Sequence, residues 1–243
     1  MCYDMHMPES FARFEMLIGE EALLALKHKK VIIFGVGGVG GYALEGLVRS
    51  GVGHIDIVDM DDVAESNLNR QIIATRDSIG KAKVDVAKAR ALSINPDAVI
   101  TIHKHFYLPD DHGDIDLSQF DYVIDAIDTV KAKLDIISEC ARLGVPLISS
   151  MGCGNRMDPS KLRYADLYKT KNDPLSKVMR KECKKLGIKR LPVVYSEELP
   201  KKSVAPEENG RHIPASSAFV PSAAGLFIAS KVVRELIDFK EDE

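Results

Sequence analysis

From residue 30 onward, short apolar runs alternate along the chain with longer segments of mixed polarity. A continuous apolar run of about five residues, bounded by glycine or charged residues, is typical of a strand that is covered on both faces. "KVIIFG" is such a run, and "HIDIVD" indicates the next strand. The pattern predicts five strands, at residues 30–35, 54–59, 98–103, 121–128 and 145–150.

The intervening segments repeat apolar residues at helical spacing and stop at glycine or before proline. They predict helices at about 41–49, 81–95, 130–143, 174–187 and 219–237. Strands that alternate with helices through short connections favour an α/β fold. We therefore expect a Rossmann-like, doubly wound, mainly parallel sheet with helices on both faces and a C-terminal basic extension.

The chain has 243 residues, 45% of them hydrophobic, which is enough for one domain with a substantial core. Within a single domain spanning 1–243 we expect an N-terminal helical segment at 8–29, a nucleotide-binding core at 30–150 and a substrate-facing half at 151–243. A stretch rich in Pro, Ser, Glu and Lys predicts a flexible surface loop at 196–221.

Residues 1–10 have neither a basic opening nor an apolar run, so no signal peptide is predicted. No segment approaches the length of about 18 uncharged apolar residues that a membrane span needs. The four cysteines form no CxxC pair, and they indicate neither a disulfide framework nor a zinc site. We therefore expect a cytoplasmic protein.

Gly35, Gly37 and Gly40 form the pattern G-x-G-x-x-G between a predicted strand and a predicted helix. Glycines there permit a tight turn and let backbone N–H groups approach a phosphate. Asp59 ends the next strand, where a carboxylate can accept hydrogen bonds from ribose hydroxyls. On these features alone the glycine loop and Asp59 suit NAD and ATP equally well. A purely structural glycine turn is a third interpretation.

Residues farther along favour ATP. Arg70 follows the second strand, Lys83 opens the next helix, and "DAID" places two carboxylates at the predicted end of the fourth strand, Asp128 among them. A triphosphate needs arginine and lysine together with a divalent cation held by carboxylate, whereas backbone amides usually bind the NAD pyrophosphate. The sequence also offers no evident residue pair for hydride chemistry. We therefore predict an ATP site.

These motifs, in this order, resemble the ubiquitin-activating-enzyme-like family, which includes the bacterial adenylyltransferases of molybdopterin and thiamine synthesis. The resemblance implies that a substrate carboxylate attacks the α-phosphate of ATP, giving an acyl adenylate and pyrophosphate. It implies that Asp59 holds the ribose and that Asp128 coordinates Mg²⁺. It also implies that Asn67, Arg70 and Lys83 contact the phosphates. Arg13 matches an arginine that one subunit of the family dimer inserts into its partner's site, so the resemblance implies a homodimer with Arg13, Arg70, Lys83 and Asp128 as catalytic residues. The ATP-binding residues implied are Gly35, Gly37, Gly38, Gly40, Asp59, Asp61, Asn67, Arg70, Lys83 and Asp128.

The second half of the chain, from "MGCGNRMDPSKLRYADLYKTKNDPL" onward, is similar to the branch of this family that dehydrates threonylcarbamoyladenosine in transfer RNA. In that branch the threonyl carboxylate of the modified nucleoside is activated with ATP, and its carbamoyl group then closes a ring. The resemblance implies a tRNA substrate, and relatives are linked to a cysteine desulfurase and its sulfur acceptor.

Charge distribution gives an independent argument for nucleic acid. The whole chain carries −3, yet residues 156–190 hold twelve Lys or Arg and four Asp or Glu, a balance of +8. In the helix predicted at 174–187, Leu175, Val178, Met179 and Leu186 are expected to pack on one side. The other side presents what we call the basic stripe, which suits either a phosphate backbone or a merely solvated helix face. Its residues are Lys177, Arg180, Lys181, Lys184 and Lys185.

Three other functions stay open from sequence alone. The first is an adenylyltransferase acting on the C-terminal glycine of a ubiquitin-like sulfur carrier, which the missing zinc cysteines and the basic stripe argue against. The second is a nicotinamide-dependent oxidoreductase, and the third is a nucleotide-binding scaffold without activity. Cys153, in "GCGN", is the one candidate for a reactive thiol, although a packed small residue is the more usual role for such a cysteine.

Overall fold

The computed structural model describes residues 9–201, 207–208, 211–212 and 214–240. In this part of the chain seven strands form one sheet in the order β3-β2-β1-β4-β5-β7-β6. All neighbours in it are parallel except β6, which runs antiparallel to β7 at one edge. The sheet strands are β1 (Lys30–Phe34), β2 (His54–Val58), β3 (Val99–His103), β4 (Tyr122–Asp125), β5 (Leu147–Ser150), β6 (Leu162–Asp166) and β7 (Pro192–Ser196).

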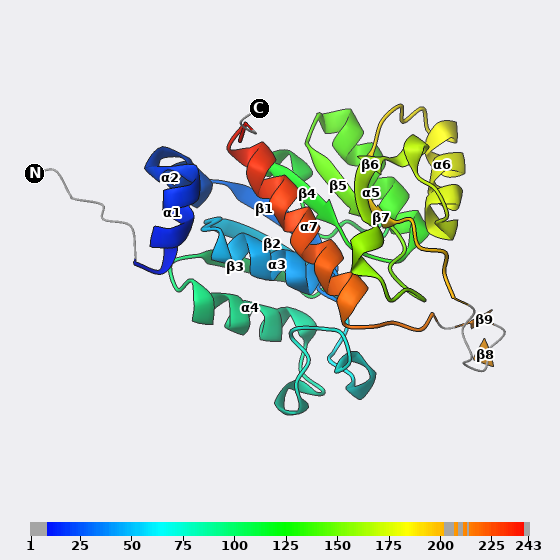
Figure 1. Cartoon of the computed structure of the whole chain (residues 1–243), viewed down its shortest axis with the longest axis horizontal. Coiled ribbons are helices and arrows are strands. Elements are labelled where there is room, and N and C mark those ends of the chain that lie inside the picture. The colour runs from blue at the N-terminus through cyan, green and yellow to red at the C-terminus, as the bar shows by residue number, and fades with distance from the viewer. Residues whose placement is uncertain (1–8, 202–206, 209–210, 213, 241–243) are drawn as a thin grey trace, which may run out of the picture.

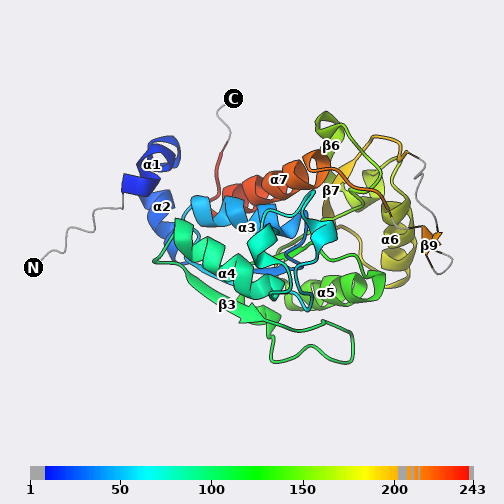
Figure 2. The same ribbon diagram turned by 90° about the horizontal axis from the view of Figure 1, so that it is seen from below.

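Helices cover both faces of the sheet, as the alternation of elements predicted. They are α1 (Ala12–Ile18), α2 (Glu20–Lys27), α3 (Gly40–Arg49), α4 (Lys83–Ile94), α5 (Val130–Leu143), α6 (Pro174–Lys185) and α7 (Phe219–Leu236). Figure 1 shows α1 and α2 at one end of the molecule and α6 at the other. Figure 2 shows α7 and α5 on opposite sides of the sheet. The predicted fold class is confirmed.

The two faces of each central strand serve two separate cores, because successive side chains of a strand point in opposite directions. Val31 and Ile33 of β1 pack with α3, α4 and α7. Ile32 and Phe34 pack with α5 and α6. All four side chains are fully buried, which explains why β1 reads as an unbroken apolar run.

The strands β6 and β7 were not predicted. Charged residues interrupt the apolar pattern of β6, where Arg163 is exposed even though Leu162 beside it is buried. β7 reads "PVVYS", contains no charged residue and has four buried residues, so its signal was present and was missed. Since β6 is an edge strand, only part of it needs to be apolar.

The surface loop predicted at 196–221 is shorter in the structure. Ser196 still belongs to β7, and α7 already begins at Phe219. Between them β8 (Glu207–Glu208) and β9 (Arg211–His212) form a two-stranded antiparallel pair. Residues 202–206, 209–210 and 213 lie outside the described residues, so the predicted flexibility of this loop stays a prediction.

Among the helices that the structure describes, none has both the length and the apolar character that crossing a lipid bilayer requires.

Candidate active site

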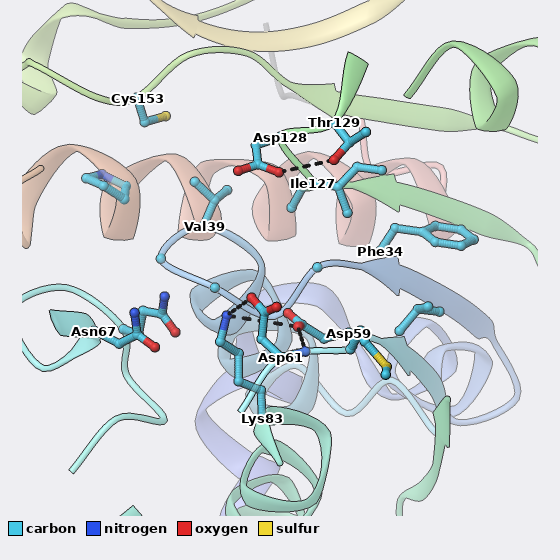
Figure 3. Close-up of a pocket in the computed structure, with 18 of the residues that line it drawn as sticks. Phe34, Val39, Asp59, Asp61, Asn67, Lys83, Ile127, Asp128, Thr129 and Cys153 are labelled. Atoms are coloured by element: carbon cyan, nitrogen blue, oxygen red, sulfur yellow. Dashed lines mark hydrogen bonds and ion pairs between the residues drawn. The ribbon is translucent and has the colours of Figure 1, made fainter. Parts of the chain in front are cut away.

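A pocket of about 400 Å³ opens at the carboxyl ends of β1, β2 and β4 (Figure 3). The order of the sheet reverses between β1 and β4, and ligands of open α/β sheets bind at such a switch point. We call this cavity the strand-end pocket. It collects most of the residues predicted for ATP: Gly35, Gly37, Gly38, Asp59, Asp61, Asn67, Arg70, Lys83 and Asp128.

Gly35 and Gly40 allow backbone segments at the floor of the pocket to approach each other more closely than residues with a Cβ atom would permit. Gly35 has a positive φ of 85°, and a Cβ there would lie 2.9 Å from the carbonyl oxygen of Ala126. A Cβ on Gly40 would lie 1.7 Å from the carbonyl oxygen of Gly35. The first turn of α3 therefore sits directly against the end of β1, and the glycine loop that leads into it lines the pocket with Gly37 and Gly38, an arrangement that suits phosphate.

Asp59 links the glycine loop to the end of β2. One of its carboxylate oxygens accepts a hydrogen bond from the N–H of Val36 at 2.9 Å, and the other accepts from the N–H of Asp61 at 2.9 Å. Each carboxylate oxygen still has a lone pair to offer, so the group remains able to accept from a sugar hydroxyl.

Lys83 is the first residue of α4, and its side chain is only 7% exposed. Its Nζ lies 2.7 Å from Asp61 and 3.9 Å from Asp59 (Figure 3). Asp61 is itself 67% exposed, so water screens that side of the pair. The lysine is thereby held at the wall of the pocket, where its charge can meet a phosphate.

Asn67 and Arg70 come from the loop between β2 and α4. Asn67 is buried, and its amide oxygen accepts from the N–H of Ala64 at 3.0 Å. The Arg70 guanidinium donates to Ser66 O and Asn69 Oδ1, both at 2.9 Å, and its aliphatic stem packs near Gly38.

Gln71 is a pocket residue that the sequence analysis missed. It is 7% exposed, and its amide oxygen has no hydrogen-bond partner among the described residues. A buried acceptor without a partner costs about 1–3 kcal/mol, so it marks a position where a ligand or water hydrogen would be stabilised. The only signal in the sequence is its place directly after Arg70.

The two carboxylates of "DAID" have different environments, and the prediction that both face the ligand crevice is wrong. β4 ends at Asp125, not at residue 128. Asp125 is fully buried and paired with Lys133, whereas Asp128 lies in the following turn, lines the pocket and is exposed. The Thr129 hydroxyl, at 3.5 Å, is the one hydrogen-bond partner of the Asp128 carboxylate in the described structure.

Lys133 lies at the centre of a buried polar cluster that the sequence analysis also missed. Its Nζ donates to Asp125 at 2.8 Å, to Ser149 Oγ at 3.2 Å and to the carbonyl oxygen of Ser150 at 2.9 Å. All three N–H donors are used, and both charged side chains are 0% exposed. The cluster joins α5 to the carboxyl ends of β4 and β5, directly behind the pocket.

Arg156 and Asp173 form a second buried ion pair, at 3.1 Å, which contacts the chain segment that carries Cys153 and Gly154. Asp173 caps α6 by accepting from the N–H of Ser176 at 3.0 Å, and it also accepts from the N–H of Gly152 at 3.4 Å. Arg156 donates to the carbonyl oxygens of Gly152 and Glu198. Since Cys153 and Gly154 line the pocket, this pair connects the pocket wall to the start of α6.

Cys153 is buried, and burial raises the pKa of its thiol to about 11. The thiol is therefore almost wholly protonated at neutral pH, and the thiolate is the nucleophilic form. This environment favours the interpretation of Cys153 as a packed residue.

Arg13 does not line the strand-end pocket. It is exposed on α1, and neighbouring Phe11 and Leu23 pack near Gly51, just beyond the C-terminal end of α3. The pocket lies at the other end of α3, whose ten residues span about 15 Å. A role for Arg13 in catalysis therefore requires the pocket of a second copy.

The basic stripe on α6 differs in two ways from the prediction. Val178 and Leu186, expected to pack, are 45% and 52% exposed, whereas Ser176, Met179 and Cys183 are buried. Arg180 turns back to bond Thr170, and Lys185 pairs with Glu182 at 2.8 Å. Within the described structure, this leaves three stripe residues without a hydrogen bond or ion pair to their side chains: Lys177, Lys181 and Lys184.

The pocket suits a Mg²⁺ ion that arrives with a phosphate ligand. No group of three or more His, Cys, Asp or Glu side chains in the described ranges could hold a metal alone. Mg²⁺ typically binds through one or two carboxylates plus substrate phosphates and water. Asp128, exposed and nearly free of partners, fits that role better than Asp59 or Asp61.

Comparison with known proteins identifies the family. The model of the ThiF family matches residues 11–242, nearly the whole chain. The chain belongs to the ThiF family. The resemblance found in the sequence is thereby confirmed.

Three members of the family illustrate the similarity. tRNA threonylcarbamoyladenosine dehydratase of Bacillus subtilis (strain 168) is 42% identical over 243 residues, covering 95% of this chain and 96% of the relative. The crystal structure of E. coli tRNA N6-threonylcarbamoyladenosine dehydratase, TcdA, in complex with ATP has a TM-score of 0.83 at 33% identity, covering 94% of each chain; the AMP complex gives the same values. The adenylyltransferase and sulfurtransferase MOCS3 of Culex quinquefasciatus is 36% identical over 132 residues, which is 54% of this chain and 30% of that protein.

Removing the charge of Lys133 is expected to destabilise this ThiF-family chain strongly. Lys133→Met leaves Asp125 buried without its counter-ion, so the free energy of unfolding in urea should fall by about 3–5 kcal/mol. Lys131→Met, an exposed lysine on the same helix, should change it by less than about 0.5 kcal/mol. Lys133→Met combined with Asp125→Asn should be more stable than Lys133→Met alone, and equal stability of the two would contradict the role of the pair.

The raised pKa of Cys153 predicts slow alkylation in the folded protein. A free cysteine with a pKa of about 8.5 is partly ionised at pH 7.5, so Cys153 should react with iodoacetamide at least about 100-fold more slowly. The rate should climb as the pH approaches 11, and mass spectrometry of the Cys153 peptide measures it. The control is the same peptide in urea-unfolded protein, and equal rates at pH 7.5 in the two states would refute the assignment.

Proposed function

We propose that this protein is an ATP-dependent tRNA threonylcarbamoyladenosine dehydratase. The observation that carries the proposal is the similarity, over nearly the whole length, to proteins of that name. The strand-end pocket supplies the matching chemistry, with glycine-loop amides, a lysine, an arginine and a free carboxylate at one switch point. The threonyl carboxylate of the modified nucleoside would attack the α-phosphorus of ATP, and pyrophosphate would leave.

Each pocket residue has a task in that step. Asp59 accepts from the ribose hydroxyls, the backbone N–H groups at Gly37 and Gly38 face the phosphates, and Lys83 and Arg70 balance their charge. Negative charge grows on the leaving pyrophosphate, so fixed cations at this place lower the barrier. Asp61 holds Lys83, and Asn67 shapes the loop that carries Arg70.

Asp128 would hold Mg²⁺ against the phosphates. When bound, the ion neutralises phosphate charge and acts as a Lewis acid. The turn that carries Asp128 is fixed from behind, because Asp125 accepts from the N–H of Ile127 at 3.4 Å and is itself held by Lys133.

Ring closure needs no nucleophile from the protein. The carbamoyl group of the same nucleoside attacks the activated acyl carbon and gives up one proton to solvent, while AMP leaves with one carboxylate oxygen. Relative to the carboxylic acid, the nucleoside has then lost the elements of one water. An intramolecular attack has a high effective concentration. Cys153, protonated at neutral pH, does not compete for the acyl group.

The tRNA would lie along α6. Lys177, Lys181 and Lys184 offer free ammonium groups, and phosphate contacts of this kind supply most of the sequence-independent affinity for nucleic acid. Arg180 and Lys185 contribute charge to the same surface, although Thr170 and Glu182 orient their side chains.

A homodimer would complete the site. Met16 and Leu17, close to Arg13 on α1, are 86% and 68% exposed. Apolar side chains so exposed are favourable at a subunit interface. Through it Arg13 of one copy would reach the phosphates bound by the other.

The sulfur-carrier adenylyltransferase remains the second candidate, since the same pocket chemistry serves it. The basic stripe favours an RNA substrate over a protein substrate. Relatives of the adenylyltransferase type match only about half of this chain. Contact with a cysteine desulfurase and its sulfur acceptor, and residence in the cytoplasm, stay predictions.

Asp128→Ala and Arg70→Ala should each lower pyrophosphate release by about 10²–10³-fold, because each removes a charge that stabilises the departing phosphates. The assay uses ATP, Mg²⁺ and tRNA carrying threonylcarbamoyladenosine. Asp62→Ala and Arg76→Ala, exposed residues outside the pocket, are matched controls and should keep normal turnover. Near-normal turnover of the two pocket variants would overturn the assignment.

Lys181→Glu with Lys184→Glu should weaken tRNA binding while leaving ATP affinity intact, because the stripe lies outside the strand-end pocket. The slope of log affinity against log salt should also flatten by about 0.7–0.9 for each phosphate that the variant no longer neutralises. Lys27→Glu with Lys88→Glu, on α2 and α4, changes the net charge equally and should bind tRNA normally. Unchanged tRNA affinity in the α6 variant would show that the basic stripe is only a solvated helix face.

A further inference from the structure

A second hollow, of about 520 Å³, lies at the free edge of the sheet, beside the end of β6. We call it the edge groove. Asp166 pairs with Pro192 at the amino end of β7, so the groove lies at the opposite end of the strands from the strand-end pocket. The residues that define it are Tyr164, Asp166, Tyr168, Lys169, Lys189 and Arg190.

The edge groove carries a strong excess of positive charge. Lys169, Lys189 and Arg190 are exposed, and their side chains make no hydrogen bond or ion pair within the described residues. Asp166 makes no ion pair with them among the described residues, because one of its carboxylate oxygens accepts from the N–H of Tyr168 at 2.8 Å and the other from the N–H of Leu191 at 3.2 Å. Its charge offsets one of the three, so the lining keeps a net charge of +2. Three cations are therefore available to an anion.

The aromatic rings of the groove are held in place. The Tyr168 hydroxyl donates to the carbonyl oxygen of Ile188, while the residue stays 37% exposed. The Tyr164 hydroxyl donates to Glu235 at 3.3 Å, and Lys231 covers its ring at 4.3 Å. A ring fixed at an exposed position beside cations suits stacking with a nucleobase next to a bound phosphate.

The helix α6 connects this groove to the strand-end pocket. Its first turn is tied through Asp173 to Gly152 and Arg156, at the pocket wall, and its last turn leads into Ile188, Lys189 and Arg190. Twelve helical residues span about 18 Å. The free lysines of the basic stripe lie between the two ends, so positive charge continues from the pocket to the groove.

We propose that the edge groove is a second RNA-binding site, which takes the phosphodiester backbone of the tRNA about 18 Å or more from the nucleotide being modified. The proposal rests on the proposed function and extends it to a surface remote from the chemistry. Lys189, Arg190 and Lys169 would bind phosphates, and Tyr168 would stack against an adjoining base or sugar.

Charge at a sheet edge also has an explanation without ligand binding, because charged side chains keep edge strands from pairing with other molecules. That explanation predicts no effect on RNA binding when the cations are neutralised, and it predicts self-association instead. The two accounts therefore give opposite results in one experiment.

The test neutralises the groove with Lys189→Gln and Arg190→Gln in the full-length chain. Binding of tRNA carrying threonylcarbamoyladenosine is titrated over a range of salt concentrations, and cyclisation and pyrophosphate release are measured with the same tRNA. Tyr168→Ala tests stacking separately. Lys27→Gln with Lys88→Gln is the control with equal charge change, and light scattering reports self-association.

We expect the groove variant to bind tRNA about tenfold more weakly, with a salt slope lower by about two. The KM for tRNA should rise while kcat at saturating tRNA and ATP affinity stay at wild-type values, because no groove residue touches the reacting atoms. Tyr168→Ala should weaken binding with little change of salt slope, since it removes no charge.

Wild-type activity combined with a groove variant that matches the control in affinity and salt slope would overturn the groove proposal and leave the proposed function intact. A wild-type protein that fails to cyclise the nucleoside would instead overturn the proposed function. A fall in kcat with unchanged KM would show that the groove acts on the chemistry and would also contradict the proposal.

Discussion

The ion pair of Lys133 and Asp125 is the interaction on which the site depends. Removing two charges from water costs several kcal/mol for each ion, so such a pair persists only when every donor is satisfied. Here the ammonium group binds one carboxylate, one hydroxyl and one carbonyl oxygen, and it joins α5 to the ends of β4 and β5. This contact also fixes the turn that leads to Asp128, because Asp125 accepts a hydrogen bond from the N–H of Ile127 in that turn.

The front of the strand-end pocket follows a different rule. Lys83 shares the pocket with Asp59 and Asp61, and Arg70 is bound to neighbouring loop oxygens, so the cations are oriented before any ligand arrives. Groups positioned in advance stabilise developing charge without reorganising during the reaction. The back of the pocket is thus held by the fully buried ion pair of Lys133 and Asp125, whereas the charged groups at the front line the pocket and are accessible to a ligand.

The central fold could be predicted because its strands are largely buried: β1 reads as an unbroken apolar run, and β2 and β4 keep a clear apolar pattern although each contains one aspartate. β6 could not, since Arg163 and Asp166 interrupt its apolar pattern, whereas β7 was missed although "PVVYS" contains no charged residue. Most residues predicted for ATP line one pocket because the carboxyl ends of parallel strands converge there, whereas Lys133 was missed because a lysine on a helix is usually solvated. Its signal was present: it stands three and four residues before Ile136 and Ile137, on the buried side of α5. Val178 and Leu186 were misplaced because spacing alone does not tell which flank of a helix meets the protein.

Arg156 and Asp173 make the wall of the strand-end pocket and the first turn of α6 a single rigid piece. An RNA docked along α6 as proposed is then held at a constant reach from the place where the carboxylate is activated. If the proposals hold, such a scaffold would select a nucleotide by its distance from the contacts on α6 and would need to read few of the surrounding bases.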